Sequence, residues 1–201
     1  MLTWTSQIVF DNRFKSRDED QQSFITVDCT DCVIKEKRIP FCKIWYSHKS
    51  HGPGVRYEIA ICIKTGDIVW VSGPFPAGIP DLLIFDIGLA KWLPPNELVE
   101  ADNGYKGRDN VMIPGAGVDS EQRIAKSKAR GRHESVNGRL KFFKGIADKF
   151  RHGDHDQHRT MFVAAAVIAQ IGFDHNLGLP FDVPGVGNYP GHPVPKIPDG
   201  L

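Results

Sequence analysis

The stretch TVDCTDCVI, residues 26–34, places two carboxylates and two thiols within a segment that is otherwise typical of a buried strand. Val27 and Val33 belong to a core, yet Asp28 and Asp31 lie between them. An ionised carboxylate inside a core strand costs several kcal/mol unless an opposite charge accompanies it. Three kinds of partner would satisfy these acids: a divalent metal ion, a zinc ion bound by the thiols, or a nearby arginine.

Two acids elsewhere in the chain could join Asp28 at a metal site. Asp102 follows the short apolar run ELVEA, and Glu134 is the only acid between Glu121 and Asp148. Carboxylates from two strands and one helix can converge on a pair of Mg²⁺ ions, which prefer oxygen ligands. Two such ions activate water and stabilise the leaving oxygen in phosphodiester cleavage. Spacing alone does not distinguish this arrangement from ordinary surface acids.

A zinc site competes with the carboxylate site, because Cys29 and Cys32 form a C-x-x-C motif that is followed by further zinc-binding residue types: Cys42, His48 and His51. On a strand, positions i and i+3 point to opposite faces, so both thiols cannot readily meet one ion. Buried free cysteines are therefore the favoured interpretation. The run RHGDHDQH adds three histidines, for which structural or surface roles are favoured: His152, His155 and His158.

The pattern of apolar residues predicts the elements that would position these groups. Strands are expected over residues 24–34 and 97–101, a hairpin over 55–76 with its turn at 65–67, and helices over 80–93, 120–146 and 161–173. This order predicts an α/β fold, in which a mixed sheet is flanked by helices. The strands at 24–34 and 97–101 are expected side by side in the centre of that sheet.

The 201 residues divide into a lead-in segment (1–23), one domain (24–176) and a Pro/Gly-rich tail (177–201). The N-terminus has no apolar signal region, and the longest apolar run, Met161–Phe173, is too short to span a bilayer. We therefore expect a soluble intracellular protein with reduced thiols and no membrane partner.

Charge is unevenly distributed along the chain. Residues 121–151 contain ten lysines and arginines against three acids, a net charge of +7, whereas the remainder carries −6. A basic segment beside an acidic remainder suits a protein that holds a polyanion near bound metal ions. The alternative is a solvated helix face.

Six segments resemble a known family. VDCTD, WYSHKSHGPGVRYEIAI, GDIVWVSGPFPAGIPDLLIF, VEADNGYKG, ARGRHESVNGRLKFF and FRHGDHDQHRTMFVAAAVIAQ resemble, in this order, blocks of the DDE-superfamily endonuclease domain of PIF/Harbinger-type transposases. The resemblance covers roughly residues 8–183. It implies a ribonuclease-H-like fold, DNA cleavage with two divalent ions (Mg²⁺ or Mn²⁺), and a place in the nucleus.

The resemblance also implies roles for individual residues. The family's first Asp lies in a strand motif usually written Asp-Gly-Thr and matches Asp28, and its second precedes a Gly-Tyr turn and matches Asp102. Its Glu lies in an Arg-His-Glu…Asn-x-x-Leu-Lys helix motif and matches Glu134. Asn137 and Asp81 would support these carboxylates, although Asp81 could equally complement a helix dipole. DNA phosphate contacts are expected from Lys49, Arg132, Arg139 and Lys141.

Two features depart from the family pattern. Cys29 stands where the family usually has glycine, which allows close backbone approach. Strand alternation nevertheless predicts that the Cys29 side chain points away from the Asp28 face. Nothing before residue 24 is long enough for the helical DNA-binding region that usually precedes this domain in the family, so the chain resembles a catalytic domain alone: a truncated element, a fragment or a domesticated copy. Such a domain could work with a separate DNA-binding partner protein or as an oligomer. The alternatives are an inactive transposase-derived protein that only binds DNA or protein, and a zinc-stabilised binding module.

Overall fold

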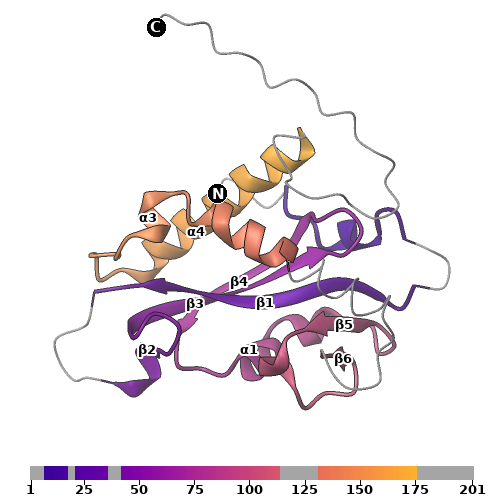
Figure 1. Ribbon diagram of the computed structural model, residues 1–201, viewed down its shortest axis with the longest axis horizontal. Helices are drawn as coiled ribbons and strands as arrows, with labels where there is room; N and C mark the ends of the chain where they lie inside the picture. The colour runs from indigo at the N-terminus through magenta and orange to yellow at the C-terminus, as the bar shows by residue number, and fades with distance from the viewer. Residues whose placement is uncertain (1–6, 18–20, 36–41, 114–130, 176–201) are drawn as a thin grey trace, which may run out of the picture.

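The computed structural model describes residues 7–17, 21–35, 42–113 and 131–175. Six strands form one mixed sheet in the order β2-β3-β1-β5-β6, with β4 also paired to β3. Helices flank the sheet on both faces (Figure 1). The strands are β1 (Ser23–Val33), β2 (Tyr46–Ser47), β3 (Gly52–Cys62), β4 (Ile68–Pro76), β5 (Leu98–Ala101) and β6 (Val111–Met112). This arrangement confirms the expected α/β class and is compatible with a ribonuclease-H-like fold.

The sheet combines antiparallel and parallel pairing. Strands β3 and β4 form the predicted hairpin, whose turn includes Gly66 at φ 77°, a left-handed conformation that glycine adopts readily. Strand β1 runs antiparallel to β3 and parallel to β5. The predicted adjacency of the first strand and the strand at 97–101 is therefore confirmed.

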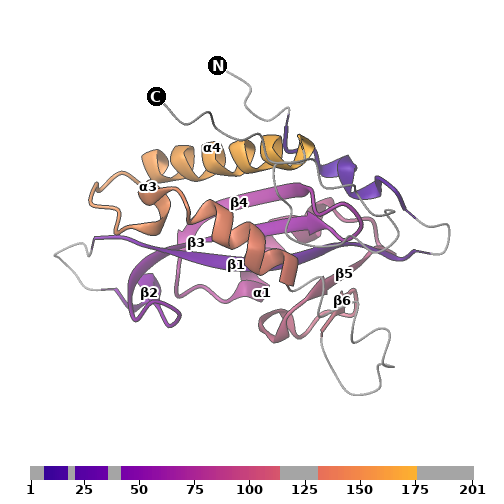
Figure 2. The same cartoon turned by 45° about the horizontal axis from the view of Figure 1, so that its top comes forward.

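The helices and short 3-10 turns between the strands are α1 (Asp81–Ile87), a helix over residues 131–140, α3 (Lys144–Ala147), α4 (His155–Asp174), η2 (Phe10–Phe14), η3 (Lys43–Trp45), η4 (Leu89–Trp92) and η5 (Asn103–Tyr105). Helix α4, α3 and the 131–140 helix cover one face of the sheet, and α1 covers the other (Figures 1 and 2). No helix within the described ranges is long and apolar enough to cross a membrane.

Each face of the sheet has its own core. On the α4 face, Val136 and Leu140 of the 131–140 helix and Phe162 of α4 pack against the sheet. On the α1 face, Ile84 and Phe85 pack against the other side of the same strands. A side chain's face on β1 therefore decides which helical layer it meets.

Two predicted helices have different limits from those expected. The helix predicted over 80–93 ends at Ile87, because Gly88 caps it and a separate 3-10 turn follows. The helix predicted over 120–146 is helical over 131–140 and then ends, since the next bonds tighten to i−3 partners (Phe142 N to Arg139 O, 3.1 Å). Its expected first half lies outside the described residues, as does the tail at 177–201.

Helix α4 contains the predicted apolar helix but begins earlier, at His155. Its N-cap residue is Asp154, whose carboxylate accepts hydrogen bonds from the backbone N–H groups of Asp156 and Gln157 at 2.9 and 3.4 Å. A side-chain cap of this kind satisfies amides that have no partner within the helix. The polar run before the apolar residues therefore belongs to the helix.

Candidate active site

Asp28 and Asp102 lie at neighbouring positions in the sheet. In the parallel pair of β1 and β5, Val27 is the partner of Ala101, so the next residues along the two strands are these aspartates. Equivalent positions of parallel strands share a face, and the strands lie about 4.8 Å apart. Both side chains are half-buried. Parallel pairing thus brings together two acids that are far apart in sequence.

A backbone amide fixes one oxygen of each aspartate. The N–H of Cys29 donates to Asp28 Oδ1 at 2.7 Å, and the N–H of Gly104 donates to Asp102 Oδ1 at 2.8 Å. Asp102 also begins the 3-10 turn η5 as its N-cap residue. Among the described residues, the second oxygen of each carboxylate accepts no hydrogen bond. Each aspartate therefore keeps an oxygen available for another partner.

The 131–140 helix packs over the same face of β1 as Asp28. Cys32 has the same strand parity as Asp28 and packs in one core with Val136 of this helix. Glu134 lies in the first described turn of the helix, where its side chain is exposed. The helix thus carries the third acid expected at the site on the face to which Asp28 belongs.

His133, which directly precedes Glu134, is close enough to both aspartates to be influenced by their charges. Its ring is only 3% exposed, and this burial lowers the pKa of His133, whereas Asp28 and Asp102 raise it. The ring also approaches the main chain of Thr26. Neither ring nitrogen completes a hydrogen bond of ordinary geometry within the described ranges. The first described turn of the helix therefore brings a buried imidazole near the two aspartates.

These residue types suit a divalent metal ion. Within the described ranges, no group of three or more His, Cys, Asp and Glu side chains is arranged to enclose an ion. Asp28 and Asp102 nevertheless offer neighbouring carboxylate oxygens, the ligand type that Mg²⁺ and Mn²⁺ prefer. Buried polar atoms are normally hydrogen-bonded, so the two ring nitrogens of His133, which have no hydrogen-bond partner of ordinary geometry among the described residues, are unusual.

Asp31 has a different environment on the opposite face of β1. It is the direct cross-strand partner of Arg56 on β3. Arg56 donates to both carboxylate oxygens, from Nε to Oδ1 at 2.7 Å and from Nη2 to Oδ2 at 2.9 Å. Ser47 Oγ donates a third hydrogen bond, at 2.5 Å. Of the three partners considered for the β1 acids, Asp31 therefore has the arginine.

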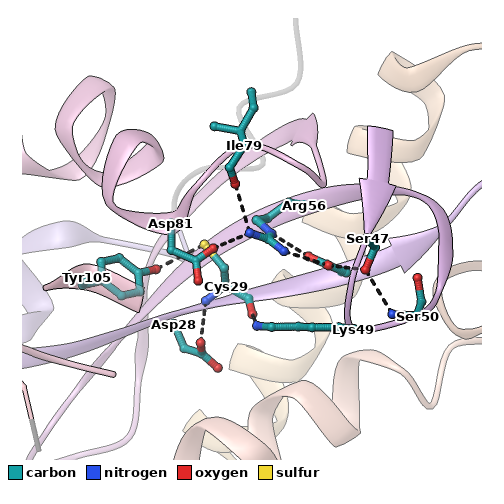
Figure 3. Close-up of polar contacts among 10 residues, drawn as sticks. Asp28, Cys29, Ser47, Lys49, Ser50, Arg56, Ile79, Asp81 and Tyr105 are labelled. Atoms are coloured by element: carbon teal, nitrogen blue, oxygen red, sulfur yellow. Dashed lines mark hydrogen bonds and ion pairs between the residues drawn. The ribbon is translucent and has the colours of Figure 1, made fainter. Parts of the chain in front are cut away.

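Asp81, in the first turn of α1, approaches the turn that carries Asp102. Its Oδ1 accepts a hydrogen bond from Arg56 Nη1 at 2.6 Å (Figure 3). A Cβ atom on Gly104 would lie 2.8 Å from Asp81 Oδ2 and 3.0 Å from Asp102 Oδ1. A side chain at residue 104 would therefore crowd both carboxylates, and glycine avoids this. Burial raises the pKa of Asp81, while Arg56 lowers it.

The expected DNA-contacting cations have different environments. Lys49 is exposed and donates from Nζ to the carbonyl of Cys29 at 2.8 Å, directly beside Asp28 (Figure 3). Lys141 is also exposed. Arg132 was expected to contact DNA, but its side chain is only 3% exposed and therefore offers little surface to a phosphate. Arg139 lies over the ring of Phe173 in α4, at 5.2 Å, and so faces the neighbouring helix.

Asn137 was expected to support Glu134 from one helical turn away. It is half-buried, and its Oδ1 accepts no hydrogen bond from the described residues. Asn137 and Glu134 lie one turn apart on the same helix, and the supporting role of Asn137 stays a prediction.

The cysteines do not form a joint metal site. Cys29 packs in the α1-side core, with Sγ 3.2 Å from the hydroxyl of Tyr105, whereas Cys32 packs in the α4-side core. Burial raises the pKa of Cys29 and raises that of Cys32 to about 12. All four cysteines are free thiols. Because the two thiols of the C-x-x-C motif face opposite layers, they cannot bind one zinc ion.

The histidines after residue 150 that were expected to be structural include two with clear packing roles. His158 is fully buried, and its Nδ1 lies 2.7 Å from the Tyr57 hydroxyl. Burial lowers the pKa of His158 to about 4, so the ring is neutral at physiological pH. His155 packs against the ring of Trp45. These contacts tie α4 to the sheet and to η3.

Sequence reasoning missed His133 and Arg56. The phase of the 131–140 helix could have located the first, because Val136 and Leu140 define its buried stripe and His133 lies at i−3 from Val136. The same phase places Arg132 inside, at i−4. No comparable signal marks Arg56, whose role depends on the register between two strands.

Comparison with known proteins agrees with this geometry. A family model described as DDE superfamily endonuclease matches residues 27–170. Searches of curated proteins and of solved structures each find no significant match. The matched range runs from the centre of β1 into α4 and includes both aspartates and the 131–140 helix. The chain therefore belongs to the DDE superfamily of endonucleases, which indicates a transposase-type nuclease.

Proposed function

We propose that this protein is a DNA endonuclease domain of the PIF/Harbinger transposase type, in which Asp28, Asp102 and Glu134 hold two divalent ions, Mg²⁺ or Mn²⁺. The observation that carries the proposal is the β1–β5 register, which makes the two aspartates neighbours on one face of the sheet. The family match supports the same assignment. Glu134 completes the set from the helix that packs over that face.

Bound divalent ions would supply an activated water and charge stabilisation for the leaving oxygen of a phosphodiester. The chain's own residues hold the ligands in place. The amides of Cys29 and Gly104 each fix one carboxylate oxygen, so the other oxygen points in a defined direction. Burial lowers the pKa of His133, and the nearby charges of the two aspartates oppose this effect, so the ring would lie beside the bound ions.

Lys49 would contact the DNA backbone next to the metal site. Its ammonium group has three donors, one of which is used by the Cys29 carbonyl. The remaining donors are available to a phosphate oxygen close to Asp28. A lysine at this position would bind DNA irrespective of base sequence, because phosphate contacts position the duplex without reading it.

Further cations would extend the DNA-binding surface from the end of the 131–140 helix. Lys141, Lys144, Lys149 and Arg151 are all exposed. They follow the helix that carries Glu134, on the face of the sheet to which Asp28 belongs (Figure 2). In a complete transposase in the nucleus, the freed 3′-hydroxyl would then attack target DNA, with target choice left to a separate DNA-binding partner.

The direct test is cleavage of supercoiled plasmid DNA with Mg²⁺ or Mn²⁺, followed as conversion to nicked circles. The wild type should nick DNA only with a divalent ion, and Asp102→Asn and Glu134→Gln should each reduce nicking to the level seen in EDTA. Asp148→Asn, which removes an exposed acid after α3, is the matched control and should cleave like the wild type.

Two outcomes would contradict the proposal. Full activity in Glu134→Gln would remove the helix from the metal site. DNA binding by the wild type with no cleavage in either metal would favour the inactive, transposase-derived DNA-binding protein.

A further inference from the structure

Arg56 is a buried cation whose contacts reach both sides of the candidate site. It lies in the middle of β3 and is 8% exposed. Besides its paired bonds to Asp31, its Nη1 donates to Asp81 Oδ1 at 2.6 Å and to the carbonyl of Ile79 at 3.0 Å. In Figure 3 the guanidinium lies between Asp81 and Ser47, which come from different elements. Arg56 thus joins β1 to the start of α1, and Asp31 extends the network to Ser47 of β2.

The first arm of this network runs from Arg56 to the loop that carries Lys49. Asp31 accepts from Ser47 Oγ, and the same oxygen of Ser47 accepts from the N–H of Ser50 at 3.1 Å. The loop between β2 and β3 is therefore tied at its start to the Arg56–Asp31 pair. Lys49 lies within this tied segment, so the position of its ammonium group depends on the pair.

The second arm runs from Arg56 to the turn that carries Asp102. Arg56 fixes Asp81 Oδ1, while Asp81 Oδ2 lies 2.8 Å from the point that a Cβ atom on Gly104 would occupy. The N–H of Gly104 in turn holds Asp102 Oδ1. Movement of Asp81 would therefore disturb the same turn that orients Asp102.

We propose that Arg56 is a positioning residue that sets, through Asp31 and Ser47, the place of Lys49 and, through Asp81, the orientation of Asp102. The functional consequence rests on the proposed metal and DNA roles of those two residues. The geometry requires arginine, because a planar guanidinium offers five donors in fixed directions. Lysine retains the charge but cannot bind Asp31 through two parallel bonds and reach Asp81 as well.

The test compares Arg56→Lys with Arg13→Lys in the full chain. Arg13 is a matched control, because it is also buried and binds a carboxylate through two donors, from Nε and Nη2 to Glu97 at 2.9 and 3.2 Å. Thermal unfolding of both variants establishes that they are folded and how much stability each loses. Hydrogen–deuterium exchange is then measured for residues 46–53 and 101–107, together with Mn²⁺ affinity by calorimetry without DNA.

We expect Arg56→Lys to speed exchange in both segments by about tenfold or more and to weaken Mn²⁺ binding by about 10–100-fold. Arg13→Lys should change neither quantity. Single-arm variants sharpen the test: Ser47→Ala should loosen only residues 46–53, and Asp81→Ala only residues 101–107.

Equal exchange in wild type and Arg56→Lys would overturn the proposal, as would the same changes in Arg13→Lys, since these would then reflect general loss of stability. Failure of the proposed function is distinguishable. If the wild type neither binds Mn²⁺ nor cleaves DNA, the metal assignment fails, while the exchange rates still decide whether Arg56 holds both segments.

Discussion

Asp28 and Asp31 are three residues apart on the same strand, yet their surroundings differ in kind. Asp31 is buried on the α1 face, where Arg56 and Ser47 donate to both of its oxygens. Asp28 is half-buried on the α4 face, where a backbone amide donates to one oxygen. Both oxygens of Asp31 are paired, whereas the second oxygen of Asp28 accepts no hydrogen bond from the part of the chain that the structure describes.

The difference follows from the pleat of β1. Positions three apart face opposite layers, so the two acids meet different elements although their local sequences are alike. The α1 face has a cation in register with Asp31, whereas the α4 face places a second aspartate in register with Asp28. Two neighbouring carboxylates repel each other, and a bound metal ion would offset that repulsion. Asp31 thus supports the fold, whereas Asp28 has an oxygen left for the metal ions proposed above.

The largest expected effect is loss of cleavage in Asp28→Asn. The change removes a charge that we propose binds metal while it preserves side-chain size, so metal-dependent nicking should fall to the EDTA background. The midpoint of thermal unfolding should remain the same or rise, because removing the charge relieves repulsion with Asp102. Plasmid nicking and a thermal melt of the same preparation measure both quantities.

Asp28→Glu provides the companion measurement, since it keeps the charge but moves it by one methylene. It should retain Mn²⁺ binding and lose most cleavage. If Asp28→Asn cleaved DNA as well as the wild type, Asp28 would have no more chemical role than Asp31.

Asp31→Asn should have the opposite profile, with a large loss of stability. It leaves the buried guanidinium of Arg56 with one carboxylate instead of two, and breaking a buried ion pair typically costs about 3–5 kcal/mol. Urea unfolding followed by tryptophan fluorescence gives the free energy of unfolding. A variant that keeps wild-type stability would show that the Asp31–Arg56 pair contributes little and would weaken the contrast between the two acids.

Glu58 extends the comparison to a buried acid without a cation. It is fully buried on the α1 face, and its Oε2 accepts from Trp70 Nε1 at 3.0 Å. Burial raises the pKa of Glu58 to about 8, with Asp81 adding to the effect. The pKa of Glu58 is about 8 in the folded state and about 4.5 in the unfolded state. Between about pH 4.5 and pH 8 the carboxyl group is therefore protonated in the folded protein and ionised in the unfolded chain. Stability should therefore fall as the pH rises from about 4.5 to about 8, and level off above that.

Glu58→Gln should remove this pH dependence. Glutamine stays neutral and still accepts from Trp70, so the variant should exceed the wild type by about 2–3 kcal/mol at pH 9 and by little at pH 4. Glu97→Gln is the matched control, because Glu97 is equally buried but paired with Arg13, and it should lose stability at neutral pH. Parallel stability curves for wild type and Glu58→Gln across this range would contradict the shift.

Much of the arrangement on the α4 face could be predicted from the sequence. Apolar runs bounded by turn residues identified β1, the β3–β4 hairpin and the apolar part of α4. Since β1 and β5 are central in a mixed sheet, the neighbourhood of Asp28 and Asp102 followed from their places on those strands. These inferences required only local patterns and one rule of topology.

The α1 face was much less predictable. The pairing of Asp31 with Arg56 depends on the exact register between β1 and β3, which side-chain alternation alone does not determine. Asp81 reaches the Asp102 turn only because Gly104 has no side chain, a contact between elements far apart in sequence. Arg132 was misplaced for a simpler reason: its charge suggested exposure, while the apolar residues one and two turns later placed it inside.

The smallest expected effect is that of Cys29→Gly on cleavage. Cys29 lies between the two acids in sequence and differs from the family's usual glycine, but its thiol lies on the opposite side of β1 from the Asp28 carboxylate (Figure 3). The β-strand conformation there needs no glycine, and the Cys29 amide already donates to Asp28. Restoring glycine should therefore change metal-dependent nicking by less than about twofold, while the lost packing and added backbone freedom lower the free energy of unfolding by about 1–2 kcal/mol. Cleavage is best compared well below the melting temperature, with Cys32→Gly as the control from the opposite face, so that stability does not limit the rate. A gain of tenfold or more in Cys29→Gly alone would mean that residue 29 restrains the site through the backbone. In that case a β1 residue on the α1 face would affect cleavage as well as stability, and the contrast between the two faces would fail.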